Sequence, residues 1–319
     1  MNLFLDSNIY LSFYRLSDDD LEELQKLTVV VKSKNTALYV TDQVRDEFNR
    51  NREGVIAGSL KAFETSKLPS GFPRLVMNYP DYEAMTKALA EYDKHRNSLS
   101  REVREAAANK KLHADGIIDE LFKLARKVPM TEDIWTAAQQ RFDLGKPPGK
   151  DASYGDAVNW ESLLDVVPDG EDLLFVTGDS DYSSKLDILL LADALLSEWK
   201  MKKKSTVTLY KNLNSLFKDK YPTIKLASEL ERELAIIDLA TSSNFVQTHA
   251  AIRRLDAYTD FSADEARELI NAAISNDQIH RIYDDDDVYE FFTQLAIDHE
   301  GDIDPEEWHY FWTTFGERD

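Results

Sequence analysis

Cysteine is absent from the 319-residue chain, and this absence removes several classes of chemistry. Disulfides, thiolate zinc sites, iron–sulfur clusters and cysteine nucleophiles are excluded, and a reducing, intracellular environment is favoured. No apolar run has the length of a membrane span. The chain also opens on an apolar, strand-like segment without the basic start of a signal peptide. We therefore expect a cytoplasmic protein with no membrane-spanning segment.

Positive charge is scarce as well, since 38 Lys and Arg face 59 Asp and Glu for a net charge of −21. The imbalance is concentrated in residues 261–319, where 17 acidic residues against 3 Arg give −14. We expect this acidic end to bind a basic protein, to self-associate or to shield a site. Basic residues gather instead at 101–127, which form either a nucleic-acid-binding face or an ordinary solvated helix surface.

Short apolar runs alternate with long helical patterns along the first two thirds of the chain. We predict strands at residues 2–5, 37–41, 173–177, 206–210 and 224–227. Helices are predicted at residues 18–31, 42–67, 82–128 with a break near 97–100, 156–164 and 186–200. This alternation indicates an α/β fold in which helices flank a central parallel sheet.

The pattern also predicts two domains. Residues 1–228 form the α/β domain, which carries a long, charged and Ala-rich helical insertion at about 82–145. Residues 229–319 are helical throughout, with aromatic and aliphatic residues at helical spacing, and form an acidic helical module. No fixed-period internal repeat is present.

Acidic residues follow several of the predicted strands. Asp6 ends the first strand, and Glu47 lies in the helix after the second. Asp156 opens a later helix, while Asp179 and Asp181 follow the third strand. Because parallel strands end at one edge of a sheet, we expect these carboxylates to lie close together. Clustered carboxylates repel one another unless a cation lies between them, and Mg²⁺ or Mn²⁺ is the simplest such ion.

Each acid also has a purely structural interpretation. Asp6, Asp156 and Asp179 stand where Asp commonly caps a helix or forms a turn. Glu47 has acidic neighbours on its helix, so it is equally compatible with a solvated surface position. The agreement of several acids in chain order favours a shared site over these separate explanations.

The order of these motifs resembles that of a known family. Residues 4–10 (FLDSNIY) resemble the first strand of PIN-domain nucleases, and residues 41–47 (TDQVRDE) resemble their second strand and the acid that follows. Residues 155–157 (GDA) and 176–181 (VTGDSD) are similar to the two later acidic motifs. The loop at 146–151 (KPPGKD) is similar to that of a larger bacterial PIN-like subgroup with a long helical insertion. The resemblance spans the predicted α/β domain.

The resemblance implies a PIN-like three-layer fold and a metal-dependent phosphodiesterase that acts on RNA or, less often, on DNA. Bound Mg²⁺ or Mn²⁺ would polarise a phosphoryl oxygen and activate a water molecule for attack. Asp6, Asp156 and Asp179 are the first choices as metal ligands, and Glu47 and Asp181 would complete the site or orient the water. The alternative is a PIN-like module that has lost catalysis and binds RNA or protein.

Neutral and basic residues near the acids are predicted to support this chemistry. Asn8 is expected to hold Asp6 through an Asx-type hydrogen bond. Thr177 or Ser180 is expected to cap a helix after the third strand. Lys146 and Lys150, in the Pro-rich loop, would neutralise substrate phosphates unless that loop is only a rigid structural turn.

Overall fold

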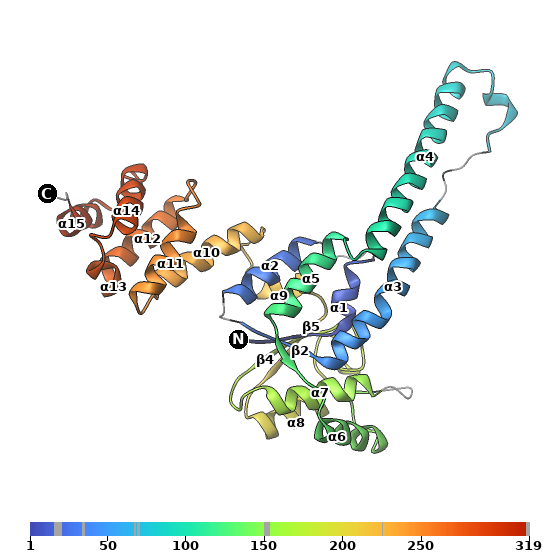
Figure 1. The fold of residues 1–319 in the computed structure, drawn as a ribbon, viewed down its shortest axis with the longest axis horizontal. Coiled ribbons are helices and arrows are strands. Elements are labelled where there is room, and N and C mark those ends of the chain that lie inside the picture. Colours follow the sequence, from blue (N-terminus) through green and yellow to red (C-terminus); the bar gives the residue numbers. More distant parts are fainter. Residues whose placement is uncertain are drawn as a thin grey trace. The chain divides into compact units, whose positions relative to one another are not determined.

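The computed structural model describes two compact units of the chain, Met1–Thr223 and Ile224–Asp319, shown in Figure 1. The described residues are 1–15, 21–33, 36–66, 68, 71–149, 154–224 and 226–316.

Five parallel strands form one sheet within the described part of the first unit, in the order β3-β2-β1-β4-β5. They are β1 (Asn2–Leu5), β2 (Ala37–Thr41), β3 (Arg126–Val128), β4 (Leu173–Val176) and β5 (Val207–Tyr210). Every residue of β1 and of β4 is buried, because helices cover both faces of the sheet. This sheet confirms the predicted α/β fold.

Helices lie on both faces of the sheet in Figure 1. One layer contains α1 (Ser7–Ser12), α2 (Leu21–Lys32), α5 (His113–Leu124) and α9 (Leu213–Lys220). The other contains α6 (Glu132–Asp143), α7 (Gly155–Val166) and α8 (Asp193–Lys203). Ring contacts join the second layer to the sheet, since Trp160 lies with its centroid 6.3 Å from that of Phe175 on β4.

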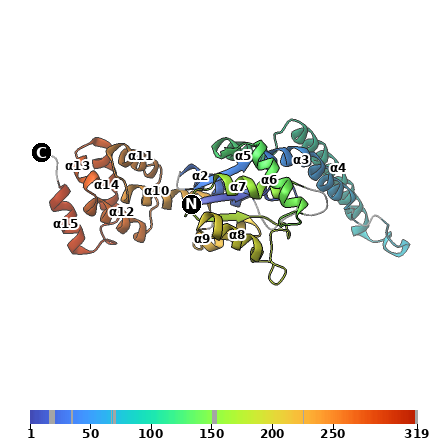
Figure 2. The same cartoon turned by 90° about the horizontal axis from the view of Figure 1, so that it is seen from below.

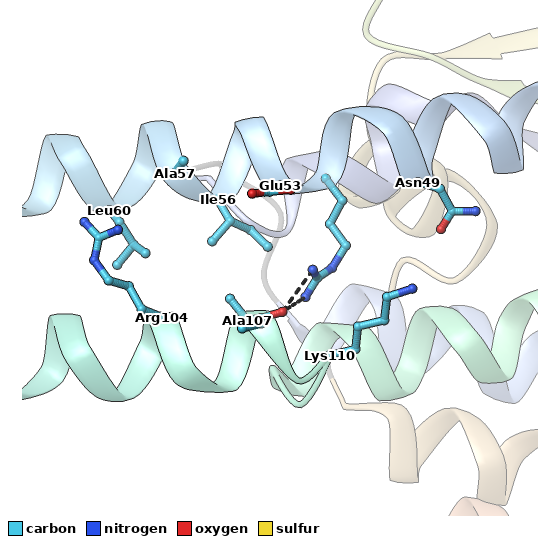
Figure 3. A pocket seen from close by; sticks show the side chains of 10 residues that line it. Asn49, Glu53, Ile56, Ala57, Leu60, Arg104, Ala107 and Lys110 are labelled. Atoms are coloured by element: carbon cyan, nitrogen blue, oxygen red, sulfur yellow. Dashed lines mark hydrogen bonds between the residues drawn. The ribbon is translucent and has the colours of Figure 1, made fainter.

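Two long helices, α3 (Asp42–Thr65) and α4 (Pro80–Ala108), lie side by side in both views (Figures 1 and 2). The short helix η1 (Arg74–Val76) lies between them in the chain. Figure 3 shows a pocket of about 610 Å³ between them, into which Ile56 and Leu60 project from α3. Arg52 also lines it and joins the two helices by donating to the carbonyl oxygen of Ala107 at 3.2 Å, and it donates to both carboxylate oxygens of Asp115, at 2.7 and 2.6 Å.

The second unit has a hydrophobic core of its own. Its helices are α10 (Ala227–Ala240), α11 (Phe245–Leu255), α12 (Ala263–Ser275), α13 (Asp277–Arg281), α14 (Asp286–Asp298) and α15 (Pro305–Phe315). Leu269, Phe292 and Phe311 are fully buried in this core. None of the helices in the described ranges of either unit combines the length and the apolar character needed to cross a bilayer.

Two strand predictions need correction. The strand predicted at 224–227 is wrong, because Leu226 is the N-cap of α10 and Ala227 is its first residue. β3 lies inside the segment predicted as a helical insertion at 82–145. This strand has only three residues, two of them exposed and basic, and pairs with β2 alone, so it lacks the apolar run that identifies a buried strand.

Two helix predictions also differ from the structure. The break predicted near 97–100 is wrong, because α4 is continuous there. Arg96 and Ser100 are buried on α4 and donate to Ser66 and Glu64 at the end of α3, so contacts between the helices stabilise this turn. The helix predicted at 186–200 begins only at Asp193, and a bridge between Ser183 and Leu191 holds the preceding loop.

Candidate functional site

The strand order defines where a site is expected. The chain passes from β1 to β2 and β3 on one side, and then places β4 on the opposite side of β1. The carboxyl ends of β1 and β4 therefore form a topological switch point, where open α/β sheets bind ligands in a crevice. Asp6 follows β1 and Thr177 follows β4, so both lie at this point.

Asp6 is only 4% exposed and is held by three hydrogen bonds. Its Oδ1 accepts from the backbone N–H of Ser7 at 2.7 Å, which makes Asp6 the N-cap of α1. Its Oδ2 accepts from Asn8 Nδ2 and from Thr177 Oγ1, each at 2.7 Å. Asn8 Oδ1 in turn accepts from the N–H of Gly178 at 3.1 Å. Hydrogen bonds around the Asp6 carboxylate thus join the ends of β1 and β4.

Asp156 lies in the first turn of α7 and is half-buried. The hydroxyl of Tyr182, a fully buried residue, donates to Asp156 Oδ1 at 3.1 Å. α7 is tied to the start of α3 because Thr41, the N-cap of α3, donates from Oγ1 to Asn159 Oδ1 at 2.6 Å. These contacts fix the helix that carries Asp156 against the carboxyl end of β2.

Asp179 and Asp181 occupy the turn after β4. The N–H of Asp179 donates to Thr177 Oγ1 at 3.0 Å, and the N–H of Asp181 donates to Asp179 Oδ1 at 2.9 Å. Lys211, which directly follows β5, donates from Nζ to the carbonyl oxygen of Asp179 at 3.0 Å. This lysine brings a positive charge to the edge of the carboxylate group.

The carboxylates influence one another electrostatically. Burial raises the pKa of Asp6 from 3.8 to about 6, the hydrogen bond from Thr177 opposes this, and the charges of Glu47 and Asp179 add to it. Burial also raises the pKa of Asp156 from 3.8 to about 7, with further contributions from Asp6, Asp179 and Asp181 and an opposing one from the Tyr182 hydroxyl. These charge effects link Asp6 to Glu47, in the second turn of α3, and to Asp179, and they link Asp156 to Asp6, Asp179 and Asp181.

The donor set fits a hard divalent cation in its chemistry. It offers carboxylate oxygens from several elements, and it carries a mutual repulsion that a cation would relieve. In the described ranges, however, no three His, Asp or Glu side chains converge closely enough to hold an ion as they lie. Asp6, Asp156 and Asp179 each already accept a hydrogen bond, but a carboxylate has about four lone-pair directions, so acceptor capacity remains.

The structure describes one of the two lysines that were predicted to bind substrate phosphates. Lys146 is exposed at the end of α6, and Lys150 lies outside the described residues. The intervening Pro147 is anchored because its carbonyl oxygen accepts from Arg141 Nη1 at 2.6 Å. The same guanidinium binds Glu161 at 2.5 Å, so Glu161 serves in an ion pair that holds this loop.

Three residues near the acids were not predicted from the sequence in the role that the structure gives them. No helix begins directly after β4, so neither Thr177 nor Ser180 is a helix cap, and Thr177 instead binds Asp6. Tyr182 has no sequence signal beyond lying next to Asp181. Lys211 does have a sequence signal, because it is the first residue after β5, whose carboxyl end lies at the same edge of the sheet as those of β1 and β4.

Comparisons with known proteins bear on the first unit. A family model described as "PIN domain" matches residues 3–182. No curated protein and no solved structure matches the chain.

Proposed function

The chain belongs to the PIN-domain family, a nuclease-type family, and from this premise we propose that it is a divalent-metal-dependent endonuclease acting on RNA. The matched residues 3–182 contain all five carboxylates described above. The choice of RNA over DNA rests on the resemblance to PIN-domain nucleases, which implies action on RNA or, less often, on DNA.

One observation carries the proposal. Asp6 and Asp156 are acids whose pKa values are raised to about 6 and about 7 by burial and by neighbouring carboxylates. A protein gains no stability from placing like charges together in a buried site. Such a cluster at the switch point of a parallel sheet is therefore best explained by a cation that binds there during function.

Bound Mg²⁺ or Mn²⁺ would supply Lewis-acid activation of the scissile phosphate and of the attacking water. We assign Asp6, Asp156 and Asp179 to hold this ion. Glu47 and Asp181 would accept hydrogen bonds from the attacking water and so orient it. No side chain in the cluster needs to form a covalent intermediate.

Neighbouring residues position these acids. Asn8 and Thr177 hold the Asp6 carboxylate at 2.7 Å from each, which limits its rotation. Tyr182 does the same for Asp156. Lys146 and Lys150 would bind substrate phosphates. We further propose a cytoplasmic location, and a basic protein or a second copy of the chain as the partner of the acidic unit Ile224–Asp319.

Cleavage of labelled single-stranded RNA and DNA tests the proposal. The wild type should cleave RNA only when Mg²⁺ or Mn²⁺ is present. Asp6→Asn and Asp156→Asn should each lower kcat by at least about 100-fold, because each removes a charge from the site of the metal. Asp165→Asn is the matched control, since Asp165 is an exposed acid on the same helix as Asp156, and it should cleave like the wild type.

The alternative of a non-catalytic binding module predicts a different result. No cleavage with either metal, together with RNA binding that is unchanged in Asp6→Asn and Asp156→Asn, would support that alternative. Cleavage of DNA but not RNA would retain the nuclease and correct its substrate.

A further inference from the structure

A groove of about 1430 Å³ begins beside Glu47 and beside Asn8, which binds Asp6, and it follows α3 away from the sheet. Ser7, Asn8 and Glu47 line its first part, and Phe63 and Ser66 line the far end. From Glu47 to Phe63 the helix rises about 24 Å. The groove is larger than a typical small-molecule pocket of roughly 300–1,000 Å³. Its size and its continuity with the cluster point to an extended ligand.

Two glycines lie in the interior of α3 and line this groove. Glycine in a helix interior is destabilising relative to alanine, because it loses more backbone freedom on folding. Packing does not require it here, since a Cβ added at Gly54 or Gly58 would meet nothing within 4 Å. The two residues are four apart and seven and eleven residues after Glu47, so they share its face of the helix. The floor of the groove is therefore open beside an acid of the cluster.

Two arginines make the same groove attractive to anions. Arg15 and Arg50 line it and are exposed, and neither has an acidic partner in the part of the chain that the structure describes. The pocket on the other side of α3 is different. Its guanidinium groups are occupied, because Arg52 binds Asp115 at 2.6 Å and Arg104 binds Glu64 at 2.7 Å.

Aromatic and polar side chains complete the lining. Phe13 is half-buried and Phe63 is 40% exposed, so both offer ring surface to the groove. Rings next to arginines are the combination with which proteins bind unstacked bases and their phosphates. Asn51 and Ser59 add an amide and a hydroxyl group that can hydrogen-bond a ribose 2′-OH. Stacked bases of a duplex would not reach the rings, so a single strand fits better.

We propose that this groove along α3 is the binding track for one strand of RNA, which it delivers to the carboxylate cluster. The track uses Arg15 and Arg50 for phosphates and Phe13 and Phe63 for bases. Gly54 and Gly58 allow the strand to approach the helix backbone. The inference rests on the proposed function for the identity of the ligand, whereas its test measures binding separately from cleavage.

The test is RNA binding by the full chain in EDTA, measured by fluorescence anisotropy with a short labelled single-stranded RNA. Gly58→Trp should weaken binding by roughly 10-fold or more, because the indole fills the open floor. Gly116→Trp is the matched control, since Gly116 is an exposed helical glycine that also has open space around it and does not line the groove. It should bind RNA within about 2-fold of the wild type.

Arg50→Gln provides a second variant that leaves the shape of the helix unchanged. It should weaken binding and reduce the slope of log K against log salt by about 0.7, the contribution of one phosphate contact on a single strand. In cleavage assays both variants should raise KM more than they lower kcat, because they act on the strand away from the reacting phosphate.

The outcomes separate this inference from the proposed function. Wild-type cleavage with unchanged binding and KM in Gly58→Trp and Arg50→Gln would overturn the track and leave the nuclease intact. Binding that is lost in both variants, without cleavage by any form of the protein, would support the track and overturn the nuclease. Equal affinity for DNA of the same sequence would overturn the assignment to RNA, and a wild type that binds neither strand would overturn the track.

Discussion

At the scale of single residues, the main feature is that ionising the buried acids lowers the free energy of unfolding. Asp6 and Asp156 have pKa values of about 6 and about 7 in the folded chain, against an ordinary value of 3.8. These two carboxyl groups therefore hold more protons in the folded protein than in the unfolded chain between about pH 4 and pH 7. Under that condition the free energy of unfolding falls as pH rises.

The metal-free protein should accordingly lose stability between pH 4 and pH 7, by an amount on the order of a few kcal/mol. Chemical denaturation in EDTA at several pH values measures this directly. Asp156→Asn should flatten the dependence, because the amide does not titrate, and Asp165→Asn should not change it. A wild-type stability that is constant or rising across this range would contradict the assigned environment of the acids.

The placement of the acids after strands was predictable from sequence, because apolar runs identify β1, β2 and β4. Their role as metal ligands stays a prediction. Their supporting residues were harder to find. Thr177 was expected as a helix cap, yet its hydroxyl donates to Asp6 at 2.7 Å. Tyr182 binds Asp156 across 26 residues of chain. Such contacts depend on the tertiary structure, and local sequence patterns do not predict them.

At the scale of elements, strands with strong apolar runs were predicted well. β1, β2, β4 and β5 all have them. β3 was missed because a short edge strand of basic residues carries no such run, and its position comes only from pairing with β2. The predicted break in α4 was wrong because contacts with α3 stabilise that turn. Tertiary contacts thus decided the elements for which local preference was weak.

The elements also explain how acids that are distant in sequence meet. Asp6 depends on β1, Glu47 on α3 and Asp156 on α7. α3 and α7 are joined where Thr41 binds Asn159 at 2.6 Å. These three acids therefore lie on or directly next to a regular element, which places a side chain more precisely than a long loop would.

At the scale of the whole molecule, the chain combines two units with different charge. The acidic excess lies mainly in residues 261–319, with a net charge of −14, whereas the carboxylate cluster belongs to the unit Met1–Thr223. The second unit buries Leu269, Phe292 and Phe311 among its own helices. Each unit thus has the core that independent folding requires.

Expressed separately, residues 1–223 and 224–319 should each fold and unfold cooperatively, as judged by circular dichroism and calorimetry. The full chain should give a transition for each unit, and added Mn²⁺ should raise only the melting temperature of the unit that contains Asp6. Failure of residues 224–319 to fold alone would contradict the assignment of a separate core.

Calorimetric titration of Mn²⁺ into the full chain at neutral pH tests the central claim most directly. Binding should release protons, because Asp6 and Asp156 are partly protonated near that pH and must ionise to hold the ion. Binding should be lost in the double variant Asp6→Asn, Asp156→Asn and retained in Asp165→Asn. Absence of binding in the wild type, or equal binding in the double variant, would contradict the carboxylate cluster as the metal site.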